Sequence, residues 1–541
     1  MRLGRRNFLT SAAFLAASEA VPVGFCEGCT DDATLMNLGL KKQLFFDDLL
    51  IESVEGITRE FHQPYKYEGN PLIVKDKPWE HVVYFRTASY RVLRDPKDKL
   101  FKCWYTDEGF TNEVLRRGVT FPMYRSLYAY SEDGIHWVKP ALGIYRDNGM
   151  ETNIFWGDPQ SDSAEVRDVI IDPFESDESR RFKSIHLHAP TASAIGQYDY
   201  GQAYMQMSYS ADGVHWKVYD ELPSFGNCGP HLDDVMILSY DLDSKLYILN
   251  TRHPRMGTGV ALNPRFPTKK TFIPPYYPRD FAKMNKRRIY RCESADFIHW
   301  TDPALILAPD EEDNLDDSMY GMAQYRLGDT WVGLLNMFHE VPNVMDVQLA
   351  YSLDGQCWKR VRKPWFTAGS AGSWDQIMVE IATDPLEVGD ELWFYYGGSG
   401  WAHHDWYVVG LKEGLDVPEA GDVSKVGFFM GLAKLRLDGF CSLNGGLVRE
   451  GILITRPLAS PGTGIVMNAD CGHAGYIDVE VLNRADEVRP GYSRRDFDRF
   501  TGNAVRHQLS WQSRTNVPPD DFRKLIFYMR NAKLYSLQFS A

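Results

Sequence analysis

Acidic residues stand directly before several predicted strands of this chain, and basic residues follow the strands that return. The residues before the strands include Glu80, Asp168, Asp233, Asp234, Asp317 and Asp375. Arg252 follows one return strand, and His403 and His404 follow another. A protonated carboxylic acid held near an ionised carboxylate can carry out general acid and base chemistry. The fold must therefore bring these strand ends together if they are to act as one site.

Five segments predict β-hairpins, because each contains two apolar runs around a turn rich in Asp, Pro or Gly. They are residues 90–106, 169–187, 236–252, 322–338 and 380–397. A third strand then leads into a Ser-x-Asp-x-x-x-Trp box at 131–137, 210–216, 294–300 and 352–358, with a weaker copy at 435–440. One meander per repeat, repeated around an axis, is typical of a β-propeller. We predict five blades over roughly residues 60–440, with a strand at Leu44–Ile51 or in the nearby early region helping to close the ring.

The boxes themselves are expected to be structural. An Asp in such a turn accepts hydrogen bonds from nearby backbone N–H groups, and the Trp packs between blades.

In a hairpin, the start of the first strand and the end of the second lie at the same edge. The acidic residues should therefore gather on one face of the disc, near its axis. Carboxylates beside tryptophans suit cleavage of a glycosidic bond, which needs one protonated acid and one ionised carboxylate. We predict that Glu80, Asp168 and Asp234 are catalytic, with Asp47 or Asp48 as alternatives to Glu80, and Asp233 as the alternative to Asp234. The predicted substrate-binding residues are Asp48, Trp79, Arg86, Arg167, Arg252, Asp317, Tyr320, Trp374, Asp375, His403 and His404.

The chain has 541 residues, more than one ordinary hydrophobic core requires, so a second domain is expected. Residues 441–541 read as short strands separated by turns, which predicts a C-terminal antiparallel β-sandwich without catalytic residues. The fold class is thus all-β, with residues 21–440 forming the propeller. The net charge of −14 argues against a nucleic-acid partner, and no apolar run outside the N-terminus is long enough to span a membrane.

Residues 1–20 predict an export signal. Arg5 and Arg6 precede a short apolar stretch that ends in small residues, as in a twin-arginine leader cut after Ala20. The sequence therefore predicts a bacterial protein exported to the periplasm or the cell exterior. Of the eight cysteines, only Cys26 and Cys29 are close enough in sequence to suggest a local disulfide. No second Cys or His pair accompanies them, so neither a metal nor a cofactor is predicted.

The arrangement resembles the five-bladed propeller glycoside hydrolases, the superfamily of invertases, levanases and arabinanases, in a form with a C-terminal sandwich. Arg167 and Asp168 resemble the Arg-Asp-Pro motif of that superfamily, with Val169 in the place of the proline. The resemblance implies a carbohydrate substrate and an acidic residue at the start of each of the first three inner strands. The invertase Trp-x-Asn-Asp-Pro-Asn-Gly signature and the Glu-Cys motif are absent. A non-catalytic carbohydrate-binding propeller is the main alternative, and another propeller chemistry, such as that of a lactonase or a metal-dependent lyase, is the second.

Overall fold

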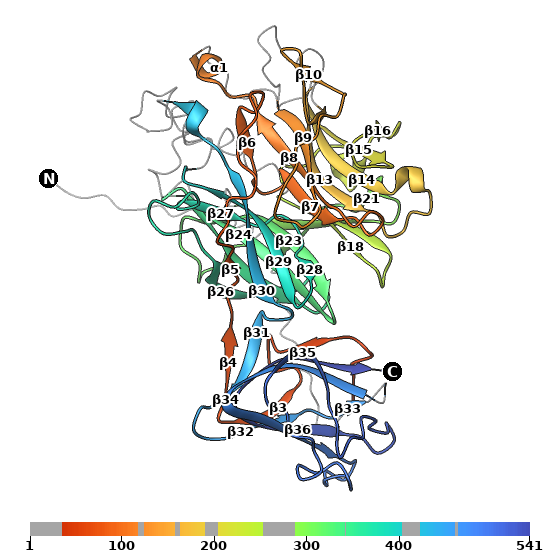
Figure 1. The fold of residues 1–541 in the computed structure, drawn as a ribbon. Helices are drawn as coiled ribbons and strands as arrows, with labels where there is room; N and C mark the ends of the chain where they lie inside the picture. The colour runs from red at the N-terminus through yellow and green to blue at the C-terminus, as the bar shows by residue number, and fades with distance from the viewer. Residues whose placement is uncertain are drawn as a thin grey trace, which may run out of the picture.

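The computed structural model describes residues 35–116, 124–156, 163–189, 204–252, 287–340, 342–402, 422–459, 462 and 464–540. These residues are nearly all β-structure, with one short α-helix, α1 (Asn112–Arg116), in the described part (Figure 1). The predicted leader and the pair Cys26 and Cys29 lie outside the described residues. None of the described helices has the length and apolar character needed to span a membrane.

The first three antiparallel sheets follow one another along the chain. The first contains β6 (Val82–Tyr84), β7 (Tyr90–Arg94), β8 (Phe101–Glu108), β9 (Tyr124–Ser131) and β12 (Ile154–Trp156). The second contains β13 (Ser163–Ile171), β14 (Phe182–Ala189), β15 (Tyr204–Ser210) and β16 (Trp216–Val218). The third contains β17 (Ser224–Phe225), β18 (Met236–Asp241), β19 (Leu246–Thr251), β20 (Ile289–Ser294), β21 (His299–Trp300) and β22 (Ala304–Leu307).

Two further meanders share one sheet, because β25 and β27 are joined by a single parallel bridge. The fourth meander is β23 (Asp317–Leu327), β24 (Thr330–His339), β25 (Val344–Ser352) and β26 (Lys359–Phe366). The fifth is β27 (Met378–Glu380), β28 (Leu386–Val388), β29 (Glu391–Ser399) and β30 (Phe429–Arg436), with β5 (Tyr65–Lys66) paired to β30. The predicted hairpins are confirmed in all five meanders.

The first strands of successive meanders pack against one another, β7 on β13, β13 on β18 and β18 on β23. The fifth meander also contacts the first. The Tyr90 hydroxyl donates to the carbonyl of Glu380 at 3.2 Å, and the Tyr395 hydroxyl donates to the carbonyl of Gly134 at 2.9 Å. The meanders therefore follow one another in chain order, and the last returns to the first.

The Ser-x-Asp-x-x-x-Trp boxes form hydrogen-bonded turns, as predicted. In the box at 210–216, Asp212 Oδ1 accepts from the N–H groups of Val214 and His215 at 2.9 and 2.8 Å. The Trp216 indole donates to the carbonyl of Gly213 at 3.0 Å, and Trp104 of the first sheet donates to the same carbonyl at 2.5 Å. Each box thus closes its own turn, and this one also joins two sheets.

Eight further strands form one sheet at one end of the molecule (Figure 1). It contains β2 (Gln43–Leu44), β3 (Ile51–Glu55), β4 (Ile57–Phe61), β31 (Cys441–Gly445), β32 (Gly451–Thr455), β34 (Gly464–Leu482), β35 (Asn503–Gln508) and β36 (Lys524–Ser540). The expectation that Leu44–Ile51 helps to close the ring is wrong, since β2 and β3 pair with β36 and β32. The early strand that joins the fifth meander is β5. Several of the short strands expected after 441 are instead parts of the long, irregular strands β34 and β36.

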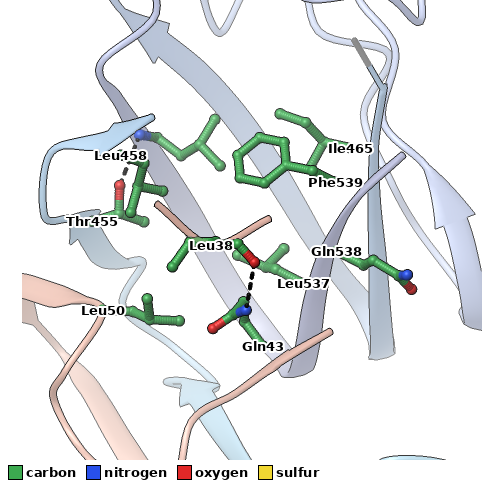
Figure 2. A pocket seen from close by; sticks show the side chains of 10 residues that line it. Leu38, Gln43, Leu50, Thr455, Leu458, Ile465, Leu537, Gln538 and Phe539 are labelled. Carbon is green, nitrogen blue, oxygen red and sulfur yellow. Dashed lines mark hydrogen bonds between the residues drawn. The ribbon is translucent and has the colours of Figure 1, made fainter. Parts of the chain in front are cut away.

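The two-residue strands β1 (Met36–Asn37) and β33 (Leu458–Ala459) pair beside this sheet, and β10 (Arg146–Asp147) pairs with β11 (Met150–Glu151). A hollow opens between β36, β34 and the early chain (Figure 2). Most of its lining is aliphatic or aromatic, including Leu38, Leu50, Ile465 and Phe539, and it contains no titratable side chain. It offers nothing for acid or base chemistry.

Candidate active site

Two β-bulges place side chains at the start of the second and fourth meanders. In β13 the pairing shifts between Val166 and Asp168, which leaves Arg167 as the extra residue. In β23 it shifts between Met319 and Gly321, which leaves Tyr320 as the extra residue. A bulge re-aims a side chain and is common beside functional sites. Both bulge residues, Arg167 and Tyr320, belong to the cluster described next.

Asp233 and Asp234 precede β18 and share one guanidinium. Arg252 Nη2 donates to Asp233 Oδ1 at 2.8 Å and also contacts Asp234 Oδ1. Burial raises the pKa of Asp233 above its ordinary value. Burial also favours a higher pKa for Asp234. The pKa of Asp234 is nevertheless held well below its ordinary value by the charge of Arg252, a hydrogen bond with Asp233 and the charge of Arg167. The pKa values of the two carboxyl groups are therefore pushed apart, that of Asp233 upward and that of Asp234 downward.

Asp234 is the more accessible member of this pair. Its side chain is 35% exposed, whereas that of Asp233 is 5% exposed. The ionised carboxylate is thus the one a substrate can reach.

Glu165, near the start of β13, is a second carboxylate of the same cluster. Its Oε2 atom lies 2.6 Å from Arg167 Nη2, and its Oε1 accepts from the Ser89 hydroxyl at 3.3 Å. Burial raises the pKa of Glu165 to about 7; Arg167 opposes this rise, and the negative charges of Glu108 and Asp234 add to it. The cluster therefore contains two carboxyl groups whose pKa is raised by burial, Asp233 and Glu165, and one, Asp234, whose pKa is held well below its ordinary value.

Three arginines surround the ring of Tyr320. The guanidinium carbons of Arg86, Arg252 and Arg287 lie 5.1, 4.5 and 5.4 Å from its centroid. Arg86 is anchored by Glu380 of the fifth meander, with Nε donating to Oε1 at 2.6 Å. The cluster thus joins residues from the first, second, third, fourth and fifth meanders.

Asp168 belongs to a different buried group. Its Oδ2 accepts from the Leu238 N–H at 2.6 Å and from Arg91 Nη1 at 3.5 Å. The other terminal nitrogen of Arg91 donates to Asp384 Oδ2 at 2.7 Å. Burial raises the pKa of Asp168 to about 7, against the effect of Arg91. Asp168 therefore joins four meanders through Arg91 and the β18 backbone.

Glu80 and Trp79 lie in another network. Lys139 Nζ donates to Glu80 Oε1 at 2.7 Å and to Oε2 at 2.8 Å. The Tyr105 hydroxyl donates to Oε1 at 2.8 Å. Trp79 is buried and donates its indole N–H to Asn153 Oδ1 at 2.9 Å. Trp79 is therefore a packed residue of this network, and its role in substrate binding stays a prediction. Among the described residues, the side chain of Glu80 has hydrogen bonds with Lys139, Tyr105 and the backbone of Asp76 and Lys77, and none with Asp168 or Asp234.

Asp317 and Asp375 also have partners of their own. Asp317 Oδ1 lies 2.7 Å from His339 Nδ1, and His339 Nε2 lies 3.1 Å from Asp346. Burial would lower the pKa of His339, but the two carboxylates raise it to about 10. Asp375 accepts from Lys66 Nζ at 2.6 Å. These contacts tie strands together.

Four predicted residues remain: Trp374, Asp48, His403 and His404. Trp374 stacks on Tyr396, with ring centroids 5.6 Å apart. Asp48 has an exposed carboxylate that pairs with Arg59 of β4 in the eight-stranded sheet, and its place in the site stays a prediction. His403 and His404 lie outside the described residues. In the described part of the chain, no group of three or more His, Cys, Asp or Glu side chains is arranged to hold a metal ion.

Sequence reasoning missed Glu165, Arg287 and Glu380. The signal for Glu165 was available, since it precedes Arg167 by two positions at the start of a predicted strand. Glu380 gave the same kind of signal, since it opens the predicted hairpin at 380–397, whereas Arg287 had no distinguishing pattern.

No protein-family model and no curated protein sequence matches the chain. Several solved structures resemble it distantly. One is a glycoside hydrolase, with 12% identity and a TM-score of 0.42 over 69% of this chain and 92% of that one. Another is a glycosyl hydrolase from Bacteroides ovatus, with 13% identity and a TM-score of 0.40 over 73% and 97%. A third is an N-acetylgalactosamine deacetylase from F. plautii in complex with blood group B trisaccharide, with 16% identity and a TM-score of 0.42 over 70% and 96%.

Proposed function

We propose that this chain is a glycoside hydrolase whose active site is the cluster around Glu165 and Asp234. The observation that carries the proposal is the separation of two carboxyl pKa values within one cluster: that of Glu165 is raised to about 7, and that of Asp234 is held well below its ordinary value. Glycosidic cleavage needs such a pair, one carboxyl protonated and one ionised.

Glu165 would donate its proton to the oxygen of the leaving group as the glycosidic bond breaks. Asp234 would either attack the anomeric carbon or remove a proton from the water that attacks it. Arg252 keeps Asp234 ionised, and Arg167 contacts the acid directly. In this assignment Asp234 keeps its predicted catalytic role, Glu165 replaces Glu80 as the second carboxylate, and Asp168 supports the fold.

The proposed architecture is a five-bladed propeller beside a β-sandwich that is built from β2, β3, β4 and the C-terminal strands. It is supported by the five meanders, by the packing of successive first strands, and by the contacts of Glu380 and Tyr395 with the first meander. Convergence of five strand starts explains why the cluster draws residues from every meander. We also propose export through the twin-arginine route, on the evidence of Arg5 and Arg6 alone. Secretion of the full-length chain, compared with an Arg5→Lys, Arg6→Lys double variant, tests that part.

The experiment for the activity is reducing-sugar release from a panel of polysaccharides and aryl glycosides. Glu165→Gln and Asp234→Asn should each lower turnover about 10²–10⁴-fold on any substrate that is cleaved. Glu178→Gln is the matched control, since Glu178 is 73% exposed and forms a surface ion pair with Lys97. Near-native turnover in both cluster variants overturns the assignment. Carbohydrate binding without cleavage of any substrate favours the binding-module alternative.

A further inference from the structure

The three guanidinium groups around Tyr320 crowd like charges onto one aromatic ring. The ring face attracts each cation, but neighbouring cations repel one another at this range. Nearby carboxylates neutralise the three positive charges to different extents. Arg86 is fixed by Glu380 at 2.6 Å, and Arg287 Nη1 donates to Glu340 Oε1 at 3.1 Å.

Arg252 uses only one of its three nitrogens on the protein. Its Nη2 serves both Asp233 and Asp234. Its Nε and Nη1 atoms, together with Nε of Arg287, are buried and have no hydrogen-bond partner among the described residues. The Arg252 side chain is only 4% exposed. Buried charged donors are rarely left without an acceptor, because they have lost water and gained nothing in return.

We propose that the substrate carries an anionic group, a sugar carboxylate or a sulfate ester, that docks between Arg252 and Arg287 beside Tyr320. This inference rests on the proposed function and names its substrate class. A guanidinium presents parallel N–H groups that match a planar two-oxygen anion better than a single hydroxyl. Because Arg252 also holds Asp234, the anionic group lies on the sugar at the cleaved bond or on the next one.

The probes are D-galacturonate, D-glucuronate and galactose 6-sulfate, compared with neutral galactose and glucose. Binding is measured by calorimetry to the full chain carrying Glu165→Gln, so that no turnover intervenes. At least one acidic sugar should bind about tenfold or more tightly than its neutral parent. Comparing the two uronates with galactose 6-sulfate shows whether the site prefers a sugar carboxylate or a sulfate ester.

Arg287→Met should remove that preference, and Arg252→Lys should weaken it while keeping the charge. Arg506→Met is the matched control, because Arg506 is 53% exposed and pairs with Glu387 and Asp390 away from the cluster. Equal binding of acidic and neutral sugars, or an unchanged preference in Arg287→Met, overturns the inference. If neutral glycosides are hydrolysed without any acidic preference, the proposed function stands and this inference falls. If the acidic preference depends on Arg287 but no glycoside is cleaved, this site stands and hydrolysis falls.

Discussion

Arg167 lies 2.6 Å from Glu165, and yet the pKa of Glu165 is raised to about 7. An adjacent guanidinium ordinarily lowers a carboxyl pKa. Here burial outweighs the cation, and the negative charges of Glu108 and Asp234 act in the same direction as burial. Glu165 is therefore a carboxyl of the cluster whose charge changes near neutral pH, as burial also raises the pKa of Asp233, while Asp234 stays ionised.

The pH dependence of kcat/KM should follow from this pair. Activity requires protonated Glu165 and ionised Asp234, so it should fall as pH rises through about 7 and also fall in acid below the ordinary aspartate range. Arg167→Met removes a cation that lowers the Glu165 pKa, and the alkaline limb should move to higher pH. An alkaline limb that stays in place or moves to lower pH would contradict this account.

Glu80 belongs to the catalytic triad predicted from the sequence but not to the cluster around Glu165 and Asp234, so its variants distinguish the two assignments. Glu80→Gln weakens the Lys139 ion pair and should lower the melting temperature, while turnover per folded molecule stays within about threefold of the native value. Glu165→Gln should lower turnover strongly and leave the melting temperature nearly unchanged. Melting curves and kcat for both variants, measured on the same preparations, give the comparison. A loss of turnover in Glu80→Gln as large as that in Glu165→Gln would restore Glu80 to the site.

The repeat pattern predicted the β-structure and the hairpins, because strand period and turn chemistry are local properties of the sequence. It also identified Arg86, Arg167, Asp234, Arg252 and Tyr320, which lie in the cluster. It placed Glu80 in the same site because strand starts look alike in sequence, whether they carry a buried ion pair or an open carboxylate. The bulges at Arg167 and Tyr320 could not be foreseen, since they depend on the pairing of β13 with β14 and of β23 with β24.

Asp168 should make stability depend on pH. Its folded-state pKa of about 7 exceeds the ordinary value of 3.8, so the folded state binds more protons between these values. Its contribution is fully present below about pH 4 and is lost as pH rises through about 7. Relative to wild type, Asp168→Asn should therefore be most destabilising near pH 4 and less so near pH 8, with a change of roughly 1–4 kcal/mol between them. Urea unfolding at both pH values measures it, and a difference that grows with pH would refute the assignment.

The buried ion pair of Arg86 with Glu380 should be costly to break. Glu380 also accepts from the Thr87 N–H at 2.9 Å, so Glu380→Gln removes a carboxylate that the buried Arg86 guanidinium contacts directly. We expect a loss of about 3–5 kcal/mol in the free energy of unfolding. Glu387→Gln is the control, because Glu387 and Arg506 are both more than half exposed and such pairs contribute about 0–1 kcal/mol. Similar losses in the two variants would show that the Glu380 pair is not held as described.

The most direct test of the central claim is the dependence of Glu165→Gln turnover on the leaving group. A general acid matters most when the leaving oxygen is strongly basic, and least when it departs readily as an anion. On an alkyl glycoside or a disaccharide, Glu165→Gln should fall about 10²–10⁴-fold below wild type, whereas on the dinitrophenyl glycoside of the same sugar it should stay within about tenfold. An equal loss on both substrates, or no loss on either, would contradict the assignment of Glu165 as the acid of a glycoside hydrolase.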